Sequence, residues 1–237
     1  MAHKRTNDLR TALHYFLDFA VILAGVSISF YFEKQNALEY KEELKNQSLG
    51  RILTNLEVDR RDFKFNIKAN NAAMNSCLWM HDHREKLDEW PLDSIGLHLS
   101  LGTFSNTILV DNQEEYKGLQ NSGLIELIEH EKIVELLQKK YIRHDFLKKI
   151  EMLLLEDKML ANYMFENTTS DSQIPPFMGY VRISKPFSSD IPHHIIERMH
   201  RKALDHEFYL NQAGYQMRAD SVLTLLIQEE LSDESVK

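Results

Sequence analysis

The stretch Leu13–Phe32, LHYFLDFAVILAGVSISFYF, contains no Lys, Arg, Glu or Pro, and its one acid is Asp18. A helix rises about 1.5 Å per residue, so these twenty residues match a hydrocarbon core of about 30 Å. The stretch therefore predicts a transmembrane helix at residues 13–32, which makes the lipid bilayer the first partner of this chain.

The charges on either side of the span predict its orientation. Lys4, Arg5 and Arg10 precede it with only Asp8 opposing them, whereas acids and bases nearly cancel just after it. An excess of Lys and Arg on the short side places that side in the cytoplasm. We therefore expect residues 1–12 in the cytoplasm of a bacterium, the span in the inner membrane and the C-terminal domain in the periplasm.

A cleaved signal peptide has the same order of a basic segment and an apolar run. Its apolar region, however, usually has about 7–15 residues and is followed by small residues in an A-x-A-like pattern. Here the run is longer and ends in FYFEKQ. The sequence favours a retained anchor over a cleaved leader.

The span carries one acid and two pairs of small residues. A charged carboxylate such as Asp18 costs about 2.5–3.5 kcal/mol at the centre of a bilayer and less near the headgroups. Asp18 either reaches the interface or packs against an identical neighbour, or it is a functional carboxylate of an oligomeric pore. Small residues four apart let membrane helices approach closely. The pairs here are Ala20 with Ala24 and Gly25 with Ser29.

Beyond residue 32 the composition predicts an acidic helical protein. Acids outnumber bases there, which disfavours nucleic acid as a partner, because duplex binding depends on clustered basic side chains. The whole chain has only 8 glycines and 5 prolines, fewer than strands and hairpins need for their turns. The predicted fold class is all-α.

Residues 33–90 are predicted to continue the anchor as one long amphipathic stalk helix that ends at Trp90-Pro91. Its apolar residues recur at spacings of four and three, as in a coiled coil. We expect this seam to pack against later helices of the same chain, with pairing between copies as the alternative. The seam consists of Leu49, Leu53, Leu56, Arg60, Phe63, Ile67, Asn70, Met74 and Cys77.

Residues 91–232 are predicted to form an antiparallel helical head. Asp111 and Glu114 form a capping box, which predicts a helix that ends where Gly123 can adopt a left-handed conformation. One long helix is expected from His130 to about Glu166.

The second part of the head begins with residues 167–190, which are rich in Ser, Thr and Pro and predict an extended loop. Asp190 is expected to cap the next helix. A last helix is expected at about residues 212–231, followed by a disordered tail at 233–237.

Catalytic and metal signatures are sparse. Glu197 and His200 form one E-x-x-H, the spacing that turns both side chains to one face, but a di-iron bundle needs two such motifs. We find no H-E-x-x-H, G-x-S-x-G, P-loop or G-x-G-x-x-G motif. Cys77, the single cysteine, lies on the seam and is read as a core residue. No cofactor is predicted.

Two blocks of sequence are similar to an uncharacterised bacterial family of single-pass membrane proteins, domain of unknown function 6090. The first block is Tyr15-Phe16-Leu17-Asp18 with the run Val21-Ile22-Leu23-Ala24-Gly25-Val26-Ser27-Ile28. The second is Tyr116 to Ile128, which follows the family's pattern Y-x-x-L-x-x-S-G-x-L-x-x-I. The resemblance implies a protein that crosses the membrane once, and it implies no activity.

Three functions follow as hypotheses. The leading one is a non-catalytic interaction or oligomerisation module, with a protein partner or a homo-oligomer. The second is a subunit of an oligomeric channel or transport complex that uses Asp18. The third is a metal-dependent hydrolase built around Glu197 and His200.

Overall fold

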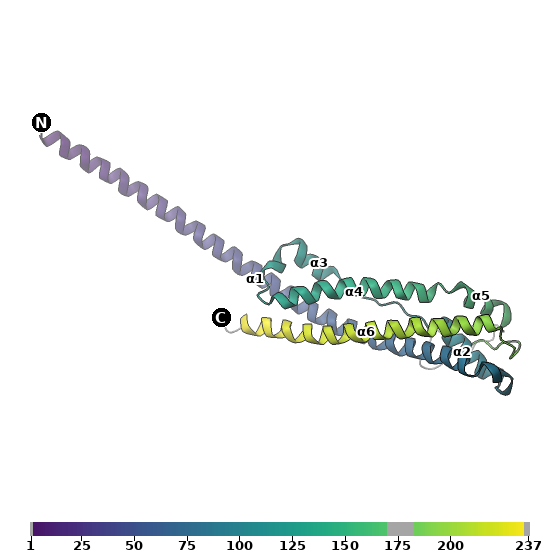
Figure 1. Ribbon diagram of the computed structural model, residues 1–237. Helices are drawn as coiled ribbons and strands as arrows, with labels where there is room; N and C mark the ends of the chain where they lie inside the picture. Colours follow the sequence, from purple (N-terminus) through teal and green to yellow (C-terminus); the bar gives the residue numbers. More distant parts are fainter. Residues whose placement is uncertain (1, 170–182, 235–237) are drawn as a thin grey trace.

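A computed structural model describes the backbone of residues 2–169 and 183–234, and the side chains of 15–169 and 183–232 (Figure 1). Over these residues the chain is helical, with one isolated bridge between Thr168 and Pro186 and no longer strand, so the all-α prediction is confirmed. The helices are α1 (Ala2–Asp82), η1 (Arg84–Glu89), α2 (Leu92–Phe104), α3 (Glu114–Asn121), η2 (Leu124–Leu127), α4 (Glu131–Leu155), α5 (Lys158–Asn167) and α6 (His193–Glu234).

Helix α1 has two parts that differ in their surroundings. Its N-terminal part projects away from the remaining helices (Figure 1), and nearly every side chain from Tyr15 to Glu43 is exposed. From Lys45 to Met80 the same helix lies inside a bundle. Most of the predicted stalk is therefore one helix of the bundle. The helix ends at Asp82 rather than at Trp90.

The seam of α1 follows the predicted spacing of four and three, but at four of the nine predicted positions the buried residue is the one before. Leu53, Ile67 and Met74 are only half-buried and Arg60 is exposed. The observed seam uses the polar residues Asp59 and Asn66, which an apolar pattern cannot select. The buried residues at spacings of four and three are Lys45, Leu49, Ile52, Leu56, Asp59, Phe63, Asn66, Asn70, Ala73, Cys77 and Met80.

Helices α4 and α6 complete the bundle. Helix α6 runs antiparallel to α1, since Lys45 meets Glu230 at one end and Cys77 shares a core cluster with Met199 at the other. Helix α4 packs along α6, and α2 covers the distal half of α1 (Figure 1). The expectation that the seam packs within the chain agrees with this arrangement.

Two predictions of helix boundaries are wrong. The C-terminal segment is one helix of 42 residues instead of two, and it begins at His193, so Asp190 is not its cap. The segment expected as one helix up to Glu166 is divided at residues 156–157. The Asp157 side chain accepts a hydrogen bond from Leu160 N (3.3 Å) and so begins α5.

Asp111 is not the cap of α3 either. That helix begins at Glu114, whose N–H donates to the Asn112 side chain (3.0 Å). Asp111 is turned into the bundle, where it binds basic groups of α4. Gly123, at φ +73°, does adopt the predicted left-handed conformation after α3.

The predicted loop 167–190 lies partly outside the described residues, which omit 170–182, and so do residues 235–237 of the predicted tail. The described part of the loop packs against α2. A Cβ atom on Gly96 would lie 2.4 Å from Ser184 O, so this approach requires glycine.

Candidate functional site

The N-terminal part of α1 contains the one helical segment, among the described residues, that is long and apolar enough to cross a membrane. None of its most apolar window is buried by the rest of the chain. Asp18 is exposed on this segment, and a Cβ atom placed on Gly25 would meet no other side chain or helix within 4 Å. Ser29 Oγ donates to Gly25 O (2.9 Å), which satisfies the hydroxyl inside the helix.

Glu197 and His200 lie one turn apart on α6, as their spacing predicts. The His200 ring stacks on His81 at a centroid distance of 3.9 Å, so ring faces meet there rather than nitrogen lone pairs. Glu197 Oε1 is 3.9 Å from His193 Nε2. No group of three His, Cys, Asp or Glu side chains within the described part of the chain is placed to hold a metal ion.

Sequence analysis missed a cluster of buried charges between α1, α4 and α6. Lys140 of α4 is 2% exposed, and its Nζ lies 2.8 Å from Asp59 Oδ2 of α1 and 3.1 Å from Asp220 Oδ2 of α6. Gln216 donates to the other oxygen of Asp220 (2.7 Å). Burial raises the pKa of Asp59, and the Lys140 ammonium offsets part of that rise.

The cluster continues along α4 to the segment before α3. His144 Nε2 lies 3.2 Å from Lys140 Nζ, and its Nδ1 lies 3.1 Å from Asp111 Oδ2. Lys148 also binds Asp111. Burial raises the pKa of the Asp111 carboxyl, but hydrogen bonds from His144, Lys148 and Gln113 outweigh this effect and hold that pKa well below its usual range. With Asp59 of α1 and Asp220 of α6, these side chains join three helices and the segment before α3 in one polar network.

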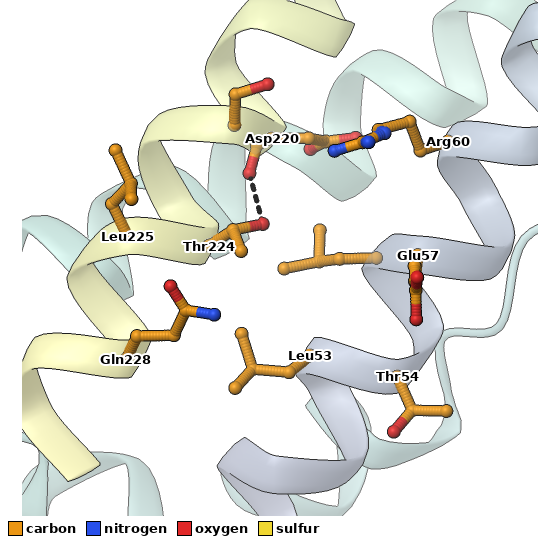
Figure 2. Close-up of a pocket in the computed structure, with 10 residues that line it drawn as sticks. Leu53, Thr54, Glu57, Arg60, Asp220, Thr224, Leu225 and Gln228 are labelled. Carbon is orange, nitrogen blue, oxygen red and sulfur yellow. Dashed lines mark hydrogen bonds between the residues drawn. The ribbon is translucent and has the colours of Figure 1, made fainter. Parts of the chain in front are cut away.

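Asp220 also lines an open groove of about 550 Å³ between α1 and α6 (Figure 2). Leu53, Leu56 and Leu225 supply its apolar surface, and Glu57 and Arg60 supply exposed charges from α1. Figure 2 shows these side chains projecting from the two facing helices. The remaining lining residues are Thr54, Ser221, Thr224 and Gln228.

The groove is suited to binding rather than to acid–base chemistry. Ser221 Oγ donates to Met217 O (2.9 Å) and Thr224 Oγ1 to Asp220 O (2.8 Å), so both hydroxyls are occupied within α6. Glu57 and Arg60 have no hydrogen-bond or ion-pair partner among the described residues. They are the groups of this groove that remain available to a ligand.

A second surface lies along the joint of α4 and α6. We call it the α4/α6 face, and it presents large apolar side chains to solvent. The rings of Phe146 and Phe208 meet edge to face at a centroid distance of 6.1 Å. Its exposed residues are Ile142, Phe146 and Leu153 of α4, with Leu204, Phe208 and Tyr215 of α6.

Comparisons with protein-family models, with curated proteins and with solved structures found no match. In the structure Asp59, Lys140 and Asp220 each lie on the buried face of their own helix, a position that the apolar pattern of the sequence does not mark.

Proposed function

We propose that this protein is a single-pass membrane protein whose helical bundle acts as a non-catalytic interaction or oligomerisation module. Residues 13–32 cross the inner membrane, residues 1–12 lie in the cytoplasm and the bundle lies in the periplasm. The single span agrees with the resemblance to domain of unknown function 6090, which implies a protein that crosses the membrane once.

The observation that carries the proposal is the exposure of an apolar helix. From Tyr15 to Phe32, large apolar side chains surround α1 on all sides and touch no other helix of the chain. In water this exposure would be unfavourable by about 25 cal/mol per Å² of apolar surface. A hydrocarbon environment removes that cost, and α1 is continuous from this segment into the bundle.

Residues 33–44 act as a spacer in this arrangement. Twelve helical residues span about 18 Å, so the bundle begins clear of the lipid headgroups. The spacer carries Glu33, Glu39, Glu42 and Glu43 against Lys34 and Lys41, and a segment with this acidic balance is not attracted to an anionic lipid surface. The bundle is thus held away from the bilayer, with its sides accessible to other proteins.

The interior supports binding over catalysis. The buried ions of the Lys140 cluster are satisfied by one another, and such networks stabilise a particular arrangement of helices. The surfaces available to a partner are the groove of Figure 2 and the α4/α6 face.

Topology and fractionation test this proposal. Full-length chains with a reporter at either terminus should show the N-terminus in the cytoplasm and the C-terminus in the periplasm. Washed membranes should retain the chain at alkaline pH, whereas a variant with Ile22→Arg and Val26→Arg should appear in the aqueous fraction. Recovery of the unchanged chain in the aqueous fraction would contradict the proposal.

A channel or transport subunit is the second candidate, and one observation favours it. On a helix of 3.6 residues per turn, Asp18, Gly25 and Ser29 lie within about 40° of one another. A membrane carboxylate on a face of small residues suits a helix–helix contact or a pore lining. Asp18→Asn should then alter ion conductance across proteoliposomes, and unchanged conductance counts against this function.

A further inference from the structure

We propose that the α4/α6 face binds a second copy of this chain, so that the protein is a parallel dimer joined through its bundle. This inference rests on the proposed membrane anchoring and names the partner that the interaction module takes. It assigns a role to the exposed apolar side chains along the joint of α4 and α6.

The six residues form one continuous surface. At about 100° per residue, Ile142, Phe146 and Leu153 lie within about 40° of one another on α4. They point away from Lys140 and His144, which are buried on the other side of that helix. Monomeric soluble proteins rarely leave contiguous apolar patches of this kind uncovered.

The matching row on α6 consists of Leu204, Phe208 and Tyr215, which also lie within about 40° of one another. The Phe146–Phe208 contact joins the two rows, and Arg143 of α4 lies over the Tyr215 ring at 4.1 Å. The face therefore follows both helices, with Lys149 of α4 and Asn211 of α6 set among its apolar side chains.

The size of the face fits a dimer. Six side chains of roughly 200 Å² each, about half exposed, would bury about 600 Å² per copy. A stable interface of standard size buries about 800 Å² per partner. The neighbouring polar side chains supply the remainder as a rim.

The geometry favours a second copy over an unrelated partner. Membrane anchors hold all copies in one orientation, so a two-fold axis must run along the bundle. Such an axis places α4 of one copy against α6 of the other, antiparallel, as in a four-helix bundle. Because Phe146 is level with Phe208 within one chain, it is also level with the partner's Phe208 across this axis.

The charges at the rim are complementary in the same arrangement. Lys149 lies on the edge of α4 away from α6, and Glu207 lies on the edge of α6 away from α4. Across the two-fold axis these edges meet, with an offset of about 3 Å along the helix. Neither side chain has a hydrogen-bond or ion-pair partner among the described residues of its own chain.

Disulfide trapping in membranes tests the dimer. Cys77 is the only cysteine, so Cys77→Ala gives a cysteine-free background. Two differently tagged full-length chains, one with Phe146→Cys and one with Phe208→Cys, should form a mixed disulfide on mild oxidation. As the matched control, Phe146→Cys with Leu225→Cys should not, because Leu225 lines the groove between α1 and α6 and lies about 25 Å along α6 from Phe208.

A charge exchange gives an independent result. Lys149→Glu and Glu207→Lys should each lower the trapped fraction about threefold or more, and the double variant should restore it to within about twofold. Leu153→Glu, at a position that is 71% exposed within one chain, should lower it about tenfold without unfolding the chain.

The outcomes separate this inference from the proposed function. A chain that remains in washed membranes but gives no 146–208 disulfide, or gives an equal yield with Leu225→Cys, overturns the dimer and leaves the anchor intact. A chain in the aqueous fraction overturns the anchor itself.

Discussion

The two parts of α1 are one uninterrupted helix, yet they are built on opposite rules. From Tyr15 to Phe32 the helix is apolar on every side and exposed, whereas from Lys45 to Met80 it is mixed in composition and buries Lys45, Asp59 and Asn66. In the first part the apolar side chains face outward. In the second part most apolar side chains, and a few polar ones, face the interior of the bundle. In α1, therefore, the more apolar part is exposed and the less apolar part is buried, so hydropathy alone does not predict which side chains the chain itself covers.

The largest expected effect comes from the buried part. Lys140→Met should lower the free energy of unfolding by about 3–5 kcal/mol, because it leaves Asp59 and Asp220 buried without their cation. Urea unfolding of full-length protein in detergent measures this. Lys139→Met, one residue away on the exposed side of α4, should change it by less than about 1 kcal/mol.

Removing the two buried carboxylate charges as well should reverse the loss of stability caused by Lys140→Met. Adding Asp59→Asn and Asp220→Asn to Lys140→Met removes both uncompensated carboxylates and should recover much of the stability. If Lys140→Met were as stable as the unchanged chain, the cluster would have no structural role, and the contrast between the two parts of α1 would lose its main support.

The register of the α1 seam can be tested at the neighbouring residues Ile52 and Leu53. Ile52→Ala should cost about 2–4 kcal/mol, because the side chain is 1% exposed, whereas Leu53→Ala on the half-buried groove side should cost about 1 kcal/mol. The same unfolding measurement decides between them. The reverse order would restore the seam predicted from the sequence.

These positions show how far the sequence could be interpreted. The heptad spacing correctly selected Leu49, Leu56, Phe63, Asn70 and Cys77, since those positions are fixed by helix geometry. It failed at every alternate position. At two of them the buried residue is polar, Asp59 or Asn66, and Asp59 is buried against Lys140 of α4. At the other two an apolar pair, Ile52 with Leu53 or Ala73 with Met74, left the register undecided by composition. Lys140 and Asp220 lie 80 residues apart, and no local pattern records their contact.

The apolar span and the all-α class, in contrast, could be predicted from the sequence. Both follow from local composition, which needs no knowledge of tertiary contacts. The caps at Asp111 and Asp190 were wrong because a capping motif is only one use of a carboxylate. At Asp111, basic groups of α4 bind the side chain more strongly than a helix end would.

Acid should weaken the buried part alone. Burial lowers the pKa of His206 to about 3, with a smaller effect from Lys202, so this ring stays neutral in the folded state. Below its ordinary pKa of about 6.5 the unfolded state binds a proton that the folded state does not, so stability is lost as pH falls. From pH 7.5 to pH 5 the loss should be about 2 kcal/mol from this residue.

Stability measured across this range in His206→Gln should show a shallower slope than in the unchanged chain. His98 contributes a loss of the same sign, because burial lowers its pKa to about 4, so part of the slope should remain. His130→Gln, at an exposed position, is the control and should keep the full slope. An unchanged slope in His206→Gln would mean that this ring becomes protonated inside the bundle.

A substitution in the exposed part of α1 should have almost no effect on the free energy of unfolding. Ile28→Ala is the same chemical change as Ile52→Ala in the same helix, but Ile28 is 56% exposed and packs on no other helix of the chain. Unfolding of the bundle should therefore change by less than about 0.5 kcal/mol. Retention in washed membranes should persist as well, since nineteen residues of the span are untouched. A loss as large as that at Ile52 would show that the span packs against the bundle, and the two parts of α1 would then share one environment.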